Sequence, residues 1–159
     1  MSFSNQNLIR SYGVFGFLVL GFFIVDRLIK NAVLGGFRHE GECISFVFVL
    51  NEGVAFSMFA FLGEYLKWIQ VALLVGLTLY LVYEKYIVNY PICLSLIFAG
   101  GISNVYDRFI HGGVVDFIYW HCGFDFAIFN FADVIIDVGV VLLLIVILIE
   151  ERQRKRSLK

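Results

Sequence analysis

Four long apolar stretches, separated by short polar segments, dominate the pattern of hydrophobic and polar positions along the chain. They cover residues 11–25, 68–83, 86–106 and about 126–149. A helix needs about 20 residues to cross the hydrocarbon core of a bilayer. The first stretch must therefore continue to about residue 29, and the last must include Asp133 and Asp137. The pattern predicts an all-α polytopic membrane protein with four transmembrane helices, over residues 11–29, 67–84, 87–106 and 128–149.

The segments between these helices predict how the helices are connected. Only the sequence EKYIVNYP separates the second helix from the third, which predicts an antiparallel hairpin, and Pro91 suits the first turn of the third helix. The longer segment over residues 35–65 contains ISFVFVL at 44–50, which alternates weakly and is rich in β-branched and aromatic residues. We therefore expect a small extracytoplasmic β-containing segment, a short strand or hairpin, between the first two helices.

The distribution of basic residues predicts the orientation of the chain. The segment EERQRKRSLK at 150–159 holds five of the twelve Lys and Arg residues and has no helical or strand periodicity that would bury it. With four spans both termini share one side, and Arg10 together with this basic tail makes that side the cytoplasm. Residues 35–65 and 107–131 are then expected on the outer side.

Composition agrees with a membrane location. Of the 159 residues, 60% are hydrophobic and one is Pro, and the mean hydropathy is +0.87, which excludes an ordinary soluble domain. The first apolar run is followed by Asp26 and Arg27 instead of a small-residue cleavage site, so we expect an uncleaved span. Residues 1–159 are expected to form a single integral membrane domain.

Three acidic side chains, Asp107, Asp116 and Asp133, are expected near the outer face, where the third helix ends and the fourth begins. Carboxylates at membrane depth are costly unless they face a protein interior or water, so they usually have a function. Two neighbouring carboxylates share a proton, and such a pair can deprotonate a water molecule while it protonates the carbonyl oxygen of an amide. The alternative is structural, with Asp116 capping a turn and Asp133 capping a helix.

Two sequence blocks around these acids, AGGISNVYDRFIHGGVVDF at 99–117 and FNFADVIIDVG at 129–139, closely resemble the two signature blocks of the lipoprotein signal peptidases, also called signal peptidase II. The segments DRLIK at 26–30 and NEGVAFS at 51–57 resemble the two upstream blocks of that family, in the same order. The resemblance covers the whole chain.

This resemblance implies an intramembrane aspartyl endopeptidase of the bacterial cytoplasmic (inner) membrane. It implies cleavage of diacylglyceryl-modified prolipoproteins immediately before the lipidated cysteine, with Asp116 and Asp133 as the catalytic pair. The implied partners are lipid-modified prolipoprotein signal peptides and membrane lipids. No cofactor, metal or nucleic acid is expected, and we expect a monomer.

Supporting residues follow from the same blocks. Asn104, Asp107 and Arg108 share one helix face, where the family resemblance implies that they orient the catalytic pair and line the site; for Asp107 a capped, salt-bridged helix end remains an alternative. Asp26 and Lys30 are four residues apart, and we expect a structural ion pair.

The remaining matches are single residues. The amide of Asn51 could steady the substrate backbone or a developing oxyanion, and Gly53 permits close approach of the chain. Asn130 could cap the fourth helix or bond a catalytic carboxylate. Ser103 stands where the family usually has Gly, and Arg27 and Glu52 are taken as unremarkable variable positions. Asp137, one helical turn after Asp133, is not covered by the resemblance.

Rival hypotheses use other residues. A small membrane transporter or metal-binding membrane protein would use His111, His121, Cys122, Asp116 and Asp125, but this set lacks recognisable ligand spacing. A protease based on Cys122 and His111, or a membrane scaffold without activity, are further alternatives, and the scaffold leaves the acids unexplained. The three cysteines indicate neither a disulfide framework nor a zinc site, and whether Cys43 and Cys122 pair stays open.

Overall fold

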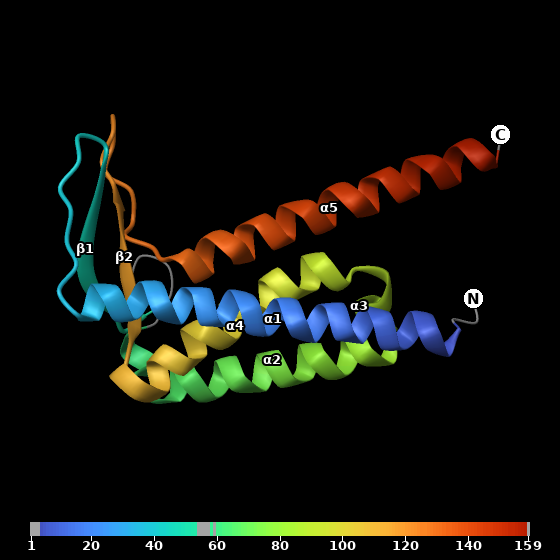
Figure 1. Cartoon of the computed structure of the whole chain (residues 1–159), viewed down its shortest axis with the longest axis horizontal. Coiled ribbons are helices and arrows are strands. Elements are labelled where there is room, and N and C mark those ends of the chain that lie inside the picture. Colours follow the sequence, from blue (N-terminus) through green and yellow to red (C-terminus); the bar gives the residue numbers. More distant parts are fainter. Residues whose placement is uncertain (1–3, 54–57, 59, 159) are drawn as a thin grey trace.

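The computed structural model describes residues 4–53, 58 and 60–158. The described residues form helices and one small sheet (Figure 1). In chain order the elements are α1 (Asn5–Leu34), β1 (Ile44–Asn51), the 3₁₀ turn η2 (Ala60–Leu62), α2 (Tyr65–Tyr83), α3 (Tyr86–Asn89), α4 (Pro91–His111), β2 (Val114–Trp120) and α5 (Phe131–Ser157). Residues 54–57 of the NEGVAFS block, and Lys159 of the basic tail, lie outside the described part.

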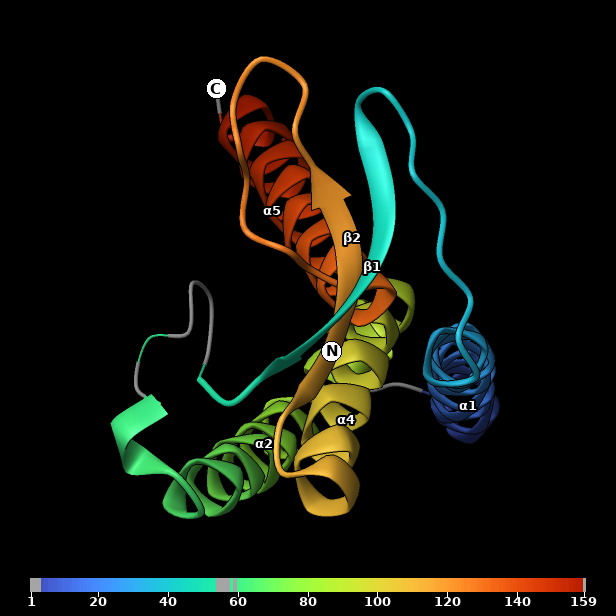
Figure 2. The same ribbon diagram turned by 90° about the vertical axis from the view of Figure 1, so that its left-hand side faces the viewer.

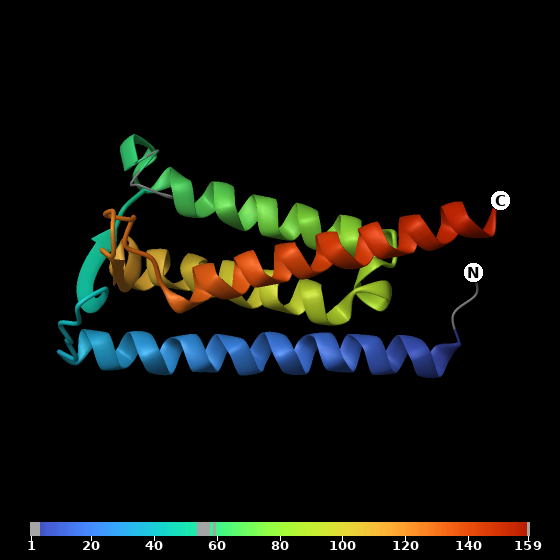
Figure 3. The same cartoon turned by 90° about the horizontal axis from the view of Figure 1, so that it is seen from above.

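The long helices run roughly along one direction, and the sheet lies across one end of them. Both termini lie at the opposite end (Figures 1 and 3). Viewed along the helices, α4 lies between α1 and α2 with α5 above it, and it packs against all three (Figure 2). The site described below is built where α4 meets the sheet and the start of α5.

By length and composition, three described helices could cross a membrane: α1, α2 and α5. Helix α4 is not among these three; its last two turns carry Asn104, Asp107 and Arg108. Of the described helices it has the most buried residues. The expected third helix, 87–106, is divided at Tyr90 into α3 and α4, and Pro91 occupies the first turn of α4 as predicted.

The outer helices are longer than predicted. Helix α1 extends from Asn5 to Leu34 instead of 11–29, with the Ser4 hydroxyl accepting a hydrogen bond from the Asn7 N–H. Helix α5 continues to Ser157, so most of the tail predicted at 150–159 is helical. An exposed Glu151–Lys155 ion pair and the basic last turn of α5 stabilise this extension.

The strand predicted at 44–50 is confirmed as β1, but its partner was not predicted. β1 pairs antiparallel with β2, from the segment between α4 and α5, and the register shifts between Phe46 and Val49. This irregularity bends the sheet. Val115 and Phe117 pack with Val33 of α1 in a small apolar core, so the β-containing part joins two connections of the chain instead of one.

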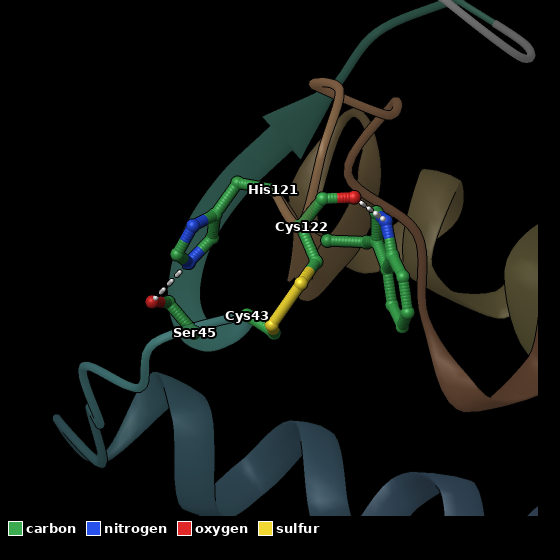
Figure 4. Close-up of a disulfide and its surroundings, with 5 residues drawn as sticks. Cys43, Ser45, His121 and Cys122 are labelled. Carbon is green, nitrogen blue, oxygen red and sulfur yellow. Dashed lines mark hydrogen bonds between the residues drawn. A yellow bond between two sulfur atoms is a disulfide. The ribbon is translucent and has the colours of Figure 1, made fainter.

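A disulfide joins the two strands at the edge of the sheet. Cys43, just before β1, pairs with Cys122, just after β2, and their Cα atoms are 4.4 Å apart (Figure 4). Beside it the Ser45 hydroxyl and the His121 Nε2 are hydrogen-bonded at 3.0 Å. The sequence left this pairing open because only the strand register, with Ile44 opposite Trp120, brings the two cysteines together. Cys93 is buried and free.

Two glycines allow α4 and α5 to approach closely. A Cβ atom on Gly100 would lie 2.4 Å from the Ala132 carbonyl oxygen, and one on Gly139 would lie 2.8 Å from the Cys93 carbonyl oxygen. Small residues permit this kind of backbone contact between membrane helices. The Gly100 contact fixes the start of α5 directly against α4.

Candidate active site

A cavity of about 450 Å³ lies below the sheet, between α2, α4 and α5. Its polar lining consists of Asn51, Gln70, Asn104, Arg108, Asp116, Asp133 and Asp137, and its apolar lining of Val114, Phe126, Ala127, Ile128, Phe129, Val134 and Ile136. The lining therefore combines three carboxyl groups with a larger number of apolar side chains, which suits a ligand that is itself largely apolar.

Asp116 lies in β2 and is almost completely buried, with 3% of its surface exposed. Its carboxylate accepts hydrogen bonds from the Asn51 Nδ2 at 2.9 Å and the Asn130 Nδ2 at 2.7 Å. Burial raises the pKa of the Asp116 carboxyl to about 6, against the two amide donors, which favour the ionised form; the Asp133 charge adds to the rise. Asp116 is thus a carboxyl that changes its charge near neutral pH.

Asp133 lies in the first turn of α5 and is half-buried. It forms a capping box with Asn130: the Asn130 N–H donates to Asp133 Oδ2 at 3.0 Å, and the Asp133 N–H donates to Asn130 Oδ1 at 3.0 Å. The Asn104 Nδ2 donates to Asp133 Oδ1 at 2.8 Å. Both carboxylate oxygens are held, so the orientation of the group is fixed.

Asn130 joins the two acids. Its side chain donates to Asp116 while its main chain donates to Asp133, and it is completely buried. The two roles considered for this residue, a helix cap and a partner of a carboxylate, therefore occur together. Asp116 and Asp133 are far apart in sequence, but one intervening residue brings them to the same cavity.

Four charged residues form a cluster between α1 and α4, and we call it the ion cluster. Its members are Asp26, Arg27, Lys30 and Asp107. The Lys30 Nζ lies 3.0 Å from Asp26 Oδ2 and 2.7 Å from Asp107 Oδ2, and all three residues are fully buried. Arg27 pairs with both aspartates, at 2.8 Å from Asp26 and 2.5 Å from Asp107. The expected Asp26–Lys30 pair is present, and Asp107 belongs to a salt-bridged helix end.

The two aspartates of the ion cluster also bind backbone. Asp26 Oδ1 accepts a hydrogen bond from the Ala132 N–H at 3.0 Å, and Asp107 Oδ2 accepts one from the Val115 N–H at 3.2 Å. Each of these N–H groups belongs to the residue immediately before an acid of the cavity. The ion cluster therefore binds the backbone directly before both Asp116 and Asp133.

Lys30 adds a further contact, because its Nζ donates to Asn104 Oδ1 at 3.0 Å. This bond sets the orientation of the Asn104 amide, so that its Nδ2 faces Asp133. The two cations balance the formal charges of the two cluster aspartates. Asp116 and Asp133 thus face a buried group of zero formal charge.

Arg108 and Asn51 organise the segment after β1. The Arg108 guanidinium donates to the Glu52 carbonyl at 3.2 Å and to the Gly53 carbonyl, and the Gly53 N–H donates to Asn51 Oδ1 at 3.0 Å. Asn51 therefore has its oxygen occupied by backbone and its Nδ2 by Asp116. Arg108 lines the cavity, but its hydrogen bonds go to the chain after β1.

Three residues of this region were missed or misjudged from the sequence. Arg27, taken as a variable position, is a member of the ion cluster, and the charge it carries within an apolar helix was an available signal. The Ser103 hydroxyl donates to Asp26 Oδ2 at 2.6 Å and accepts from Arg27 Nε at 3.1 Å, which gives a role to the unusual serine. Gln70 lines the cavity, and its amide within the otherwise largely apolar helix α2 was an available signal.

Asp137 also lines the cavity, with an exposed side chain. Within the described part of the chain the Asp137 carboxylate has no hydrogen bond. Its exposure to the cavity removes the need for one, because the group can be hydrated or can meet a ligand.

The residues of the rival metal site do not converge. Asp125 accepts a hydrogen bond from the Tyr119 hydroxyl at 2.7 Å, His121 bonds Ser45, and Cys122 is in the disulfide. Among the described residues, no three His, Cys, Asp or Glu side chains are grouped as metal ligands. The disulfide also removes Cys122 as a nucleophile.

The chain is similar to known proteins in both sequence and fold. A family profile described as signal peptidase (SPase) II matches residues 18–149. A lipoprotein signal peptidase of Wolinella succinogenes is 54% identical over 138 residues, covering 86% of this chain and 92% of the relative. One from Helicobacter pylori strain P12 is 51% identical over 154 residues, covering 96% of each chain.

Solved structures agree with the sequence comparison. A bacterial membrane enzyme determined by the in meso method at 2.3 Å resolution superimposes with a TM-score of 0.76 at 27% identity, covering 87% of this chain and 90% of that one. A second, at 1.9 Å resolution, gives a TM-score of 0.73 at 26% identity, covering 86% and 93%. With a profile match over most of its length and relatives about half identical to it, this chain belongs to the signal peptidase II family.

Proposed function

We propose that this chain is an intramembrane aspartyl endopeptidase that removes signal peptides from diacylglyceryl-modified prolipoproteins by cleavage immediately before the lipidated cysteine. The observation that carries the proposal is the pair Asp116 and Asp133, two carboxylates from distant segments that line one cavity and share Asn130 as a partner. The relatives named as lipoprotein signal peptidases support the substrate class.

In the proposed reaction one carboxylate of the pair is ionised and the other is protonated. The ionised group takes a proton from the attacking water, and the protonated group donates its proton to the carbonyl oxygen of the scissile peptide. The raised pKa of Asp116 supports this scheme, because a carboxyl of ordinary pKa would not hold a proton near neutral pH. The first carboxyl group then gives the proton it took from water to the leaving nitrogen, while the second carboxylate takes back a proton from a hydroxyl of the tetrahedral intermediate; the C–N bond breaks, the amine and the new carboxyl group are released, and the pair returns to its starting state.

The supporting residues have positioning roles in this proposal. Asn51, Asn104 and Asn130 direct amide hydrogens at the two carboxylates and set their orientation. The ion cluster holds the chain at Val115 and Ala132 and thereby sets the separation of the pair. Arg108 holds the backbone of Glu52 and Gly53, directly after Asn51, which lines the cavity.

We further propose that α4 is a fourth span and that both termini are cytoplasmic. The termini lie at the same end of the molecule, which needs an even number of crossings, and α4 returns the chain from that end to the sheet (Figures 1 and 3). The basic last turn of α5 lies at the terminal end and favours the cytoplasm. The sheet and the acidic cavity are then at the outer face.

Reporter fusions test this topology. Fusions after Lys159 and within residues 84–89 should report the cytoplasm, and fusions near Glu40 and near His111 should report the outer side, because the basic end of α5 is retained inside. The measurement is the ratio of a reporter active only outside to one active only inside. An outward C-terminus would place the cavity on the wrong side for the proposed substrate.

Cleavage by the purified protein tests the function itself. In detergent it should cut a diacylglyceryl-modified prolipoprotein peptide at the bond before the modified cysteine, and the rate should not change with a chelator or a thiol reagent, because the proposed chemistry uses only carboxylates. Cleavage sites and rates are read by mass spectrometry. A variant with Cys43, Cys93 and Cys122 replaced by Ser should stay active while it remains folded, although it lacks the Cys43–Cys122 disulfide. A chelator-sensitive rate, or loss of cleavage by this variant with its fold intact, would contradict the proposal.

A further inference from the structure

Gln70 lines the cavity and carries a buried hydrogen-bond acceptor with no partner among the described residues. It lies on α2, whose sequence is otherwise almost entirely apolar, and it lines the cavity that contains Asp116 and Asp133. Its Oε1 is shielded from solvent and has no hydrogen-bond partner among the described residues. A buried acceptor without a partner destabilises the folded protein, because it has lost its hydrogen bonds to water and gained none. Native structures rarely keep such a group without a reason, and a ligand that supplies the donor is one.

The position of Gln70 is the point where two cavities meet. A second cavity of about 250 Å³ lies between α2, α4 and α5 and is lined mainly by apolar residues, among them Leu73, Leu77 and Val105. Gln70, Asn104 and Ile136 line both cavities. Along α2 the lining passes from Gln70 to Leu77, away from the sheet, so the acidic cavity continues into an apolar groove between the helices.

A peptide segment in this groove requires hydrogen-bond partners for its backbone groups. A bond that is attacked by water must lie in an extended segment, where backbone N–H and C=O groups lose their helical partners. At membrane depth no bulk water replaces those partners, and each unpaired group costs several kcal/mol. A buried glutamine oxygen and an unpaired backbone N–H therefore satisfy each other.

We propose that Gln70 is a substrate-positioning residue whose Oε1 accepts a hydrogen bond from one backbone N–H of the signal peptide, on the amino-terminal side of the scissile bond, where the peptide passes from the apolar groove into the acidic cavity. This inference rests on the proposed function. The glutamine acts on binding and alignment, and the carboxylate pair carries the chemistry.

The test combines a protein variant with altered substrates. Gln70→Met keeps an unbranched side chain of similar length and removes the acceptor. Lipidated peptides are made in which one amide before the scissile bond is replaced by an ester, so that one N–H at a time is removed. With the wild type, one ester position should lower kcat/KM by about tenfold. Gln70→Met should lower kcat/KM for the all-amide peptide by a similar factor and should be insensitive to that same ester.

Controls separate this idea from the proposed function. Ile69→Met, on the exposed side of the same helix, should keep wild-type kinetics with every peptide. Gln70→Met should unfold thermally at the wild-type midpoint or above it, because it removes an unsatisfied buried group; a lower midpoint would reveal an internal partner and overturn the proposal. Equal ester effects in wild type and Gln70→Met would overturn it as well. A wild type that does not cleave the all-amide peptide would instead refute the proposed function.

Discussion

Asp116→Asn and Asp133→Asn are each expected to abolish cleavage of the lipidated peptide, with kcat falling by about 10³-fold or more. An amide is nearly the same shape as a carboxyl group but cannot exchange the proton that the reaction needs. The measurement is single-turnover cleavage by each purified variant. Appreciable turnover by either variant would show that the replaced residue is not part of the catalytic pair. The Asp137→Asn variant serves as the comparison, because Asp137 is the third acid of the cavity.

The thermal stability of Asp116→Asn provides a control that does not depend on activity. Because burial raises the pKa of Asp116 to about 6, its contribution to stability is fully present below the ordinary value of 3.8 and is lost as the pH rises through about 6. The wild type should therefore gain on the order of 1 kcal/mol between pH 7.5 and pH 5 relative to the pH-independent asparagine. A difference between the two proteins that does not change with pH would mean that Asp116 ionises normally.

Gly100→Ala is expected to lower kcat by about 100-fold, although Gly100 contacts no substrate. The new Cβ would lie 2.4 Å from the carbonyl oxygen of Ala132, so the first turn of α5 must move, and Asp133 moves with it. A displacement of about 1 Å in a catalytic group costs a factor of this size. The measurement is kcat and KM for the lipidated peptide.

Two other glycines make this result specific. Gly76→Ala on α2 adds its methyl group where nothing lies within 4 Å, and it should leave kinetics unchanged. Gly139→Ala also disturbs the contact between α4 and α5, with its Cβ 2.8 Å from the Cys93 carbonyl oxygen, but about two turns away from Asp133. It should lower stability more than kcat. Equal kcat losses in Gly100→Ala and Gly139→Ala would show that general packing, not the position of Asp133, is responsible.

The sequence predicted most of what depends on local pattern. Apolar runs predicted the long helices, the alternation at 44–50 predicted β1, and the family resemblance singled out Asp116 and Asp133. Pro91 was correctly placed in the first turn of a helix. These features are determined by neighbours in sequence, or by motifs that keep fixed spacing.

Features that depend on contacts between distant segments could not be predicted. The β2 strand, VVDFIYW, has no clear alternation, because its first residues are buried on both faces. The Cys43–Cys122 pair joins cysteines 79 positions apart and depends on the register of two strands from different connections of the chain. The charge of Arg27 within an apolar helix indicated a buried partner, but the partner itself, Asp107, is 80 positions away and could not be identified. The sequence also does not show that the Gln70 Oε1 is buried without a hydrogen-bond partner, because this depends on the packing of α2 beside α4.

The ion cluster also has a consequence for the biogenesis of the protein. Asp26, among the earliest residues to be synthesised, accepts a hydrogen bond from a main-chain group 106 residues later, and Asp107 accepts one from β2. A chain on the ribosome that ends after α4 still lacks the backbone groups that these carboxylates bind, and it lacks Asp133. Under the proposed mechanism we therefore expect proteolytic activity to arise only after α5 has been synthesised, and a nascent chain that ends before α5 to be inactive.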